Sequence, residues 1–268
     1  MLITTILVAA GALLIGVVAN RLLHKQLEEA DTPALTLSNF LVPLQSLTVF
    51  VLAFALVMAS TSNGKAEEAV RSEAGLLDHM YEVADFGPTA QRQRLQADVV
   101  CYTRAVRSME WPQLAHGRGS TAPNVWSTDI RGALQAMGTD TPAFGVLLSA
   151  DKERSKARQT RIAESVPAIP SAVYWLLLAG LAVLVACMAL CLPRGRKKVT
   201  TLVALTVMTA LLTSVLIVIR DVEKPFSGII QIKPTVLSAT EDDITEDFQA
   251  AYGRGHLPCD GRGLKVSA

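Results

Sequence analysis

The sequence predicts an all-α integral membrane protein with four transmembrane helices in two hairpins and a helical extramembrane domain. Four apolar segments predict the spans: Leu2–Asn20, Phe40–Ser60, Ile169–Leu192 and Val199–Ile219. Each is close to the roughly 20 residues that cross a hydrocarbon core of about 30 Å. None contains Asp, Glu, Lys, Arg or His. A buried helix of a soluble protein rarely stays uncharged for so long, so four such segments argue against a soluble fold.

The first segment is predicted to be an anchored helix rather than a cleaved signal peptide. Met1 to Thr5 supplies no positively charged n-region, and the apolar stretch is longer than a usual h-region. Residues 1–60 then form the first transmembrane hairpin, closed by a loop from Arg21 to Asn39. Residues 169–219 form the second, closed by Pro193–Lys198.

The polar region between the hairpins, residues 61–168, is predicted to be helical. From Lys65 to Phe86 the apolar residues recur at helical spacing, and no Gly-Pro break separates them from the second span, so one long rod is expected. Gly87-Pro88 should end that rod. Further helices are predicted over 89–116, with an interruption near Trp111-Pro112, and over 124–137 and 142–165.

After the fourth span, residues 220–268 contain a short motif and a C-terminal tail. Gly228–Leu237 is predicted to be extended and Glu241–Tyr252 to form a weak helix. The Gly-rich segment from Gly253 onward is expected to be mobile.

Composition and motifs disfavour several functional classes. The formal net charge is +1, with no long basic run outside the membrane flanks, so nucleic acid is not an expected partner. No nucleophile–base arrangement, phosphate loop or dinucleotide fingerprint stands out, and we therefore do not expect an enzyme.

The cysteines and histidines suggest no metal and no cofactor. Cys101, Cys187, Cys191 and Cys259 match neither a disulfide framework nor a zinc site. Cys187 and Cys191 lie four residues apart in the third span, where small packing residues are expected. The histidines are scattered and form no metal-binding pair.

The segment after the last span carries a family resemblance. Asp221 is followed by Pro225, Phe226, Ser227 and Gly228, and this Asp-x-x-x-Pro-Phe-Ser-Gly pattern resembles the bacterial membrane proteins called bestrophin-like. Bestrophins themselves have an acidic residue, a spacer and Pro-Phe-Gly at this place; here Ser227 is inserted. Structurally, Pro225 and Gly228 suit a helix stop and a turn, and we expect Phe226 to pack against the rod. The alternative is that the motif forms a wedge between subunits beside the exit of a pore.

Further matches to the bestrophin-like proteins extend over nearly the whole chain. They are Glu73-Ala74 with Leu77 and Tyr81, Tyr102 to Val106 leading to Glu110-Trp111-Pro112, and Ala157-Arg158 with Arg161. The resemblance implies a multi-pass protein of a bacterial plasma membrane, assembled as a ring of identical subunits, most simply five. It also implies an ion channel or pore for small ions. The alternative is a non-conducting membrane scaffold, or an envelope sensor, whose helical domain binds a partner.

Phe50, Phe54 and Met58 are the candidate pore-lining residues. They recur at i, i+4 and i+8 on the second span, and in bestrophins a comparable apolar ladder forms the narrow neck of the pore. Apolar constrictions gate by dewetting. The alternative interpretation is that the three side chains contact lipid or pack between helices.

Five acidic residues near the C-terminus resemble the calcium clasp of animal bestrophins only in composition: Glu241, Asp242, Asp243, Glu246 and Asp247. EF-hand spacing is absent, and acidic residues are favoured near a helix N-terminus by the helix dipole alone. We expect no calcium site.

Two counts of basic residues disagree about which side of the membrane the 61–168 domain faces. The hairpin loops carry six lysines and arginines, which places those loops in the cytoplasm, whereas the opposite ends of the spans carry nine. Bestrophins keep their long domain in the cytoplasm, and the resemblance favours the same side here. A disulfide between Cys101 and Cys259 would reverse this assignment, because disulfides persist in oxidising compartments.

Overall fold

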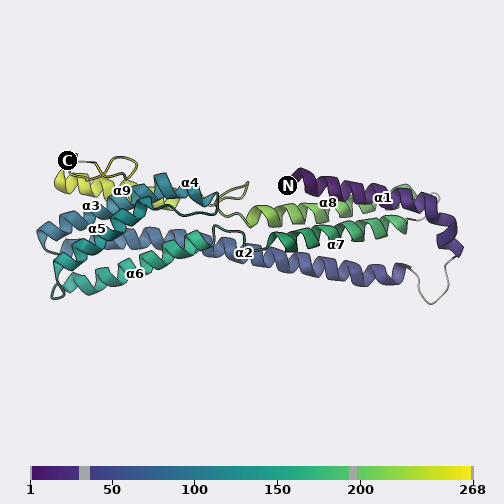
Figure 1. Cartoon of the computed structure of the whole chain (residues 1–268), viewed down its shortest axis with the longest axis horizontal. Coiled ribbons are helices and arrows are strands. Elements are labelled where there is room, and N and C mark those ends of the chain that lie inside the picture. The colour runs from purple at the N-terminus through teal and green to yellow at the C-terminus, as the bar shows by residue number, and fades with distance from the viewer. Residues whose placement is uncertain (1, 30–36, 193–197, 267–268) are drawn as a thin grey trace. The chain divides into compact units, whose positions relative to one another are not determined.

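The computed structural model describes residues 2–29, 37–192 and 198–266 (Figure 1). The loop charges at Arg194, Arg196 and Lys197 lie outside these residues. Within the described ranges the regular elements are helices, and the one β-type pairing is an isolated bridge between Cys259 and Lys265. The predicted all-α class is confirmed. The chain divides into two compact units: unit 1 contains residues 1–61 and 168–223, and unit 2 contains residues 62–167 and 224–268.

Unit 1 contains the predicted spans. They belong to α1 (Leu2–Glu29), the first part of α2 (Leu37–Val83), α7 (Ser171–Leu190) and α8 (Lys198–Val222). Each of the four is long and apolar enough to cross a membrane. Their shared core includes Leu52 and Ala55 of α2, Leu181 of α7 and Leu216 of α8.

Polar contacts at two levels of α1 bind it to α7. Asn20 donates its side-chain amide to the carbonyl oxygens of Ala189, Leu190 and Leu192, at 3.2, 2.6 and 3.1 Å. These belong to the carbonyls that have no partner inside a helix at its C-terminus. Toward the other end, Thr5 Oγ1 lies 2.7 Å from the Tyr174 hydroxyl. The first hairpin is therefore bound to the second by polar contacts as well as by packing.

In unit 2 the predicted rod is confirmed, because α2 continues without a break to Val83 and ends in the short helix η1 (Ala84–Phe86) ahead of Gly87-Pro88. The following elements are α3 (Thr89–Ala105), the π-helical turn η2 (Val106–Glu110), α4 (Trp111–Leu114), α5 (Ala122–Met137), α6 (Pro142–Ala163) and α9 (Thr235–Tyr252). The interruption predicted near Trp111 is thus a π turn followed by one more helical turn. Prolines stand in the first turns of α5 and α6, where a missing N–H costs nothing.

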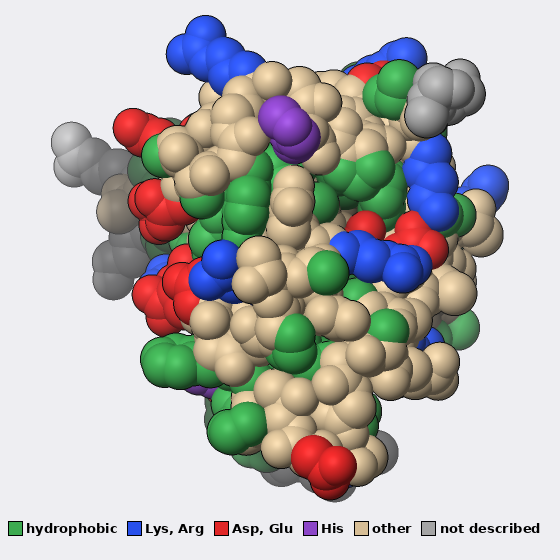
Figure 2. Space-filling view, turned by 90° about the vertical axis from the view of Figure 1, so that its left-hand side faces the viewer, with side chains coloured by type: hydrophobic (Ala, Val, Ile, Leu, Met, Phe, Trp, Pro, Cys, Tyr) green, Lys and Arg blue, Asp and Glu red, His purple; other side chains and the backbone are tan. Residues whose placement is uncertain are grey.

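The core of unit 2 is formed by α2, α3, α5, α6 and α9. Its fully buried large side chains include Met80, Tyr102, Trp126, Leu147 and Phe248. On the end of this unit seen in Figure 2, acidic and basic side chains mingle and apolar ones lie between them. Neither sign dominates, in keeping with a net charge close to zero.

The helix after the fourth span begins earlier than predicted. α9 starts at Thr235, directly after Pro234, rather than at Glu241. The stretch predicted to be extended therefore loses its last residues, Thr235–Leu237, to the first turn of α9. Leu237 is buried in the core of unit 2. This packing extends α9 toward the N-terminus, ahead of the acidic residues from which the helix was predicted.

Candidate functional site

The predicted pore-lining residues lie on the face of α2 that points away from the core of unit 1. Phe50, Phe54 and Met58 are 71, 59 and 44% exposed, whereas Leu52 and Ala55 between them are 2 and 6% exposed. Each of the three exposed side chains would contact lipid, a second subunit or a pore. The assignment to a pore stays a prediction.

The post-membrane motif begins with Asp221 in the last turn of α8 and continues beyond the end of that helix. Gly228 has a φ of +109°, a conformation that favours glycine. Ser227 N donates to Lys224 O at 3.0 Å, and Ile232 N donates to Pro225 O at 2.7 Å. The turn predicted from Pro225 and Gly228 is present, and it accommodates Ser227.

The predicted packing of Phe226 against the rod is confirmed. The ring is 6% exposed and belongs to a cluster with Ala66 and Val70 of α2 and Leu114 of α4. Trp111 meets it edge to face, with 5.3 Å between ring centroids. Pro225 is also buried, whereas Asp221 is half-buried at the end of α8. These contacts give the motif a packing role in unit 2, and any further role of its residues stays a prediction.

A buried charge network, which the sequence did not predict, lies beneath this cluster. Glu73 of α2 and Glu110 of η2 both bind Arg161 of α6: Arg161 Nε lies 2.7 Å from Glu73 Oε2, and Arg161 Nη2 lies 2.7 Å from Glu110 Oε1. Arg158 Nη2 lies 2.5 Å from Glu110 Oε2, and the Tyr102 hydroxyl donates to Glu73 at 2.7 Å. Glu73, Glu110 and Arg161 are each at most 1% exposed.

The network is made of residues that carry the family resemblance. Glu73, Tyr102, Glu110, Arg158 and Arg161 are separated by up to 88 residues along the chain, yet they form one hydrogen-bonded group. The π turn contributes by placing Glu110, its last residue, against α6. The sequence indicated that these polar residues belong together only through their matches to the same family; it did not predict that they contact one another.

The electrostatics of the network favour charged side chains. Burial would raise the pKa of the Glu110 carboxyl, but hydrogen bonds from Arg158 and the positive charges of Arg161 and Arg158 outweigh it, and the pKa lies below its usual value. Two arginines then balance two carboxylates in the buried group. Each side chain of the network has at least one charged or hydroxyl partner, and Arg161 Nη1 alone among its nitrogens has no hydrogen-bond partner among the described residues. Removing one partner of a buried ion pair is strongly destabilising, so the network holds α2, η2 and α6 together.

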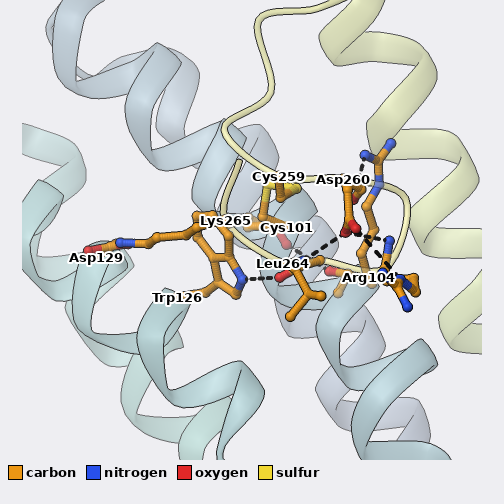
Figure 3. The surroundings of a disulfide bond; sticks show 12 residues. Cys101, Arg104, Trp126, Asp129, Cys259, Asp260, Leu264 and Lys265 are labelled. Atoms are coloured by element: carbon orange, nitrogen blue, oxygen red, sulfur yellow. Dashed lines mark hydrogen bonds and ion pairs between the residues drawn. A yellow bond between two sulfur atoms is a disulfide. The ribbon is translucent and has the colours of Figure 1, made fainter. Parts of the chain in front are cut away.

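A disulfide joins Cys101 of α3 to Cys259 in the tail (Figure 3). The expectation that the cysteines form no disulfide was wrong, because the partners are 158 residues apart and no spacing rule connects them. Cys187 and Cys191 are free thiols, and Cys191 is exposed just after α7.

The tail beyond Gly253 is docked rather than mobile over its described residues. Trp126 Nε1 donates to Gly263 O at 2.7 Å, and Lys265 Nζ lies 2.6 Å from Asp129 Oδ2, as Figure 3 shows. At Gly263 a Cβ would lie 2.4 Å from the backbone N of Ala105, so only glycine allows this approach. Gly-rich composition suggested mobility, whereas here glycine permits close packing.

The acidic run does not form a carboxylate site. Glu241 is buried and paired with Arg107, through Nε and Nη2, and with Arg104 at 3.7 Å. Asp242 and Asp243 face solvent. Across the described ranges, no group of three or more His, Cys, Asp or Glu side chains is arranged to hold a metal ion.

Comparisons with known proteins agree with this architecture. The sequence-family model of the Bestrophin-like domain matches residues 6–237 of this chain. A crystal structure of a variant bacterial bestrophin homologue from Klebsiella pneumoniae superimposes with a TM-score of 0.71 at 12% identity, covering 90% of this chain and 99% of the other. Another structure of that homologue gives 0.68 at 12% identity, with 91 and 97% covered.

A crystal structure described only as a variant membrane protein gives a TM-score of 0.70 at 12% identity, with 94 and 99% of the two chains covered. Such low identities show a shared fold and nothing further. Among curated proteins, none is detectably similar in sequence. Because the family model spans most of the sequence, from the first helix into α9, the chain belongs to the Bestrophin-like family.

Proposed function

We propose that this protein is an oligomeric ion channel or pore, a ring of identical subunits, five in number, in a bacterial plasma membrane. Membership of the Bestrophin-like family supports the proposal. So does the exposed apolar face of α2, which no other described part of unit 1 covers. The pore is passive, conducts small ions and requires no cofactor.

The observation that carries the proposal is the outward projection of Phe50, Phe54 and Met58 from one helix face. In a ring, each position contributes one side chain per subunit. Residues four apart rise by about 6 Å along a helix, so three apolar rings would follow one another at that spacing. A narrow apolar stack excludes water, and control of passage by width and wetting follows.

Planar-bilayer recording of the purified protein tests the proposal. Phe54→Ala should widen and wet the constriction and raise the single-channel conductance. Leu211→Ala on α8 is the matched control, because Leu211 is also 59% exposed but lies on a helix that is not expected to line the pore. The proposal fails if the native protein carries no current, or if both substitutions change conductance equally.

The alternative is a non-conducting scaffold or envelope sensor whose unit 2 binds a partner. The observation that favours it is the rigid construction of unit 2, closed by a disulfide and a buried charge network. Particle imaging of the detergent-purified protein separates the two functions. A ring with α2 at its axis supports the channel, whereas a monomer or dimer without a central opening supports the scaffold.

A further inference from the structure

We infer that unit 2 faces an oxidising, extracytoplasmic compartment, with the two hairpin loops in the cytoplasm. This orientation is opposite to the one that the resemblance to bestrophins favours. It goes beyond the proposed function and does not depend on it, because a channel and a scaffold could each adopt either orientation.

The Cys101–Cys259 disulfide indicates the compartment. Cys101 is fully buried and Cys259 is 6% exposed, and the tail that carries Cys259 is also held by Trp126, Asp129 and Ala105. The fold therefore brings the two sulfurs together independently of any partner protein. Cytoplasmic thiols are kept reduced, whereas disulfides form and persist outside the cytoplasm.

The order of the spans is compatible with this bond. Two spans, in α7 and α8, separate Cys101 from Cys259 along the chain. An even number of crossings returns the tail to the side on which α3 lies. The disulfide therefore requires no change to the four-span arrangement, and residues 62–167 and 224–266 share one compartment.

The conflict between the two counts of basic residues becomes smaller once the burial and the position of each charge are considered. Positive charge directs topology mainly through short loops and the residues that flank spans, and segments longer than about 60 residues cross the membrane largely regardless of charge. Residues 62–167 exceed that length. Moreover, Arg154 and Arg161 are 1% exposed and paired with carboxylates inside unit 2. The six lysines and arginines of the two hairpin loops all lie in short loops, where positive charge directs topology most strongly, and they favour a cytoplasmic position for these loops.

Cysteine accessibility in intact cells tests the inference. In a full-length background with Cys187→Ala and Cys191→Ala, Lys152→Cys on α6 adds one exposed thiol to unit 2, and Ser149→Cys is a second reporter on the same helix. Leu22→Cys, exposed at the end of the first span, is the matched control and leaves every loop charge in place. A membrane-impermeant maleimide should label Lys152→Cys and Ser149→Cys in intact cells, and Leu22→Cys only after lysis. The reverse pattern would overturn the inference.

The state of the buried pair gives an independent readout. In the same Cys187→Ala, Cys191→Ala background, free thiols are blocked in living cells with a permeant maleimide, and the protein is then denatured and treated with a polyethylene-glycol maleimide. Two polymer chains should add only after reduction. If polymer adds without reduction, or if none adds after reduction because both residues were already blocked, Cys101 and Cys259 are thiols in the cell and the inference is wrong.

Discussion

At the scale of single residues, Asp98 is a carboxyl whose environment opposes its charge. It lies on α3, 4% exposed, and its Oδ2 has no hydrogen-bond partner among the described residues. Arg94 Nε is 4.0 Å away. Burial and then the negative charge of Asp129 raise the pKa of Asp98 to about 7, against the opposing effects of Arg94 and Lys265.

This shift predicts a pH-dependent stability. The unfolded carboxyl titrates near 3.8 and the folded one near 7, so between these values the folded state binds more protons than the unfolded state. Stability is therefore fully present below about pH 4 and is lost as the pH rises through about 7. Asp98→Asn should raise the melting temperature most at pH 8, by a smaller amount at pH 5, and have little effect at pH 4.

Thermal unfolding of the detergent-purified protein between pH 4 and 8 measures this difference. Each pKa unit corresponds to about 1.4 kcal/mol, so the gain from Asp98→Asn at pH 8 should be on the order of 2–4 kcal/mol. Asp129→Asn is the companion variant: it removes one of the charges that raise the pKa and should move the transition toward lower pH. Parallel pH profiles for the native protein and Asp98→Asn would contradict the assignment.

The buried ion pairs could not be predicted from the sequence, whereas the burial of Phe226 could. Glu73, Glu110 and Arg161 could be recognised as matches to one family. Hydropathy and helical periodicity, however, do not predict which side chains form ion pairs between α2, η2 and α6. Their contacts depend on the π turn, which shifts Glu110 by a fraction of a helical turn relative to a regular helix. Phe226, by contrast, was predicted correctly because a large apolar residue between Pro225 and Gly228 has to be buried beside the turn.

At the scale of elements, the close packing of α1 on α7 depends on Gly16. A Cβ at this position would lie 2.5 Å from Ala189 Cβ and 2.7 Å from the Ala186 carbonyl oxygen. Small residues allow transmembrane helices to approach in this way, and packing is their main source of attraction in lipid. The adjoining bonds from Asn20 need the same short separation between the helices.

Gly16→Val should therefore force α1 and α7 apart and destabilise unit 1 by about 1–3 kcal/mol, the usual cost of overpacking. Gly11→Val is a closely matched control, because it makes the same change on the same helix where no atom lies within 4 Å of the added Cβ. Thermal stability and monodispersity in detergent are the measurements. Equal behaviour of the two variants would show that the α1–α7 contact is not tight.

Elements were largely predictable because their signals are local. Uncharged runs located the spans, and Gly87-Pro88 located the end of α2. The errors fell where distant contacts decide the outcome. α9 begins as early as Thr235 because Leu237 packs into the core of unit 2. The tail is held by Trp126 and Cys101, which lie more than a hundred residues away along the chain.

At the scale of the whole molecule, the disulfide closes most of the chain into one covalent loop. The bond between Cys101 and Cys259 spans 158 residues, including α5, α6, both helices of the second hairpin and α9. A cross-link over so long a loop removes conformations from the unfolded chain, and native disulfides typically contribute about 2–5 kcal/mol. Here α7 and α8 are predicted to remain in the membrane or detergent on unfolding, which already restricts the loop and favours the lower part of that range.

Cys101→Ser with Cys259→Ser should consequently lower the melting temperature by several degrees while the remaining tail contacts preserve the fold. Cys187→Ser with Cys191→Ser is the control, since these thiols are free and their replacement should have a smaller effect. A reductant should lower the melting temperature of the native protein and leave that of the Cys101→Ser, Cys259→Ser variant unchanged. If the reductant affects both proteins equally, or neither, the bond does not stabilise the molecule, because only the native protein contains a disulfide for it to reduce.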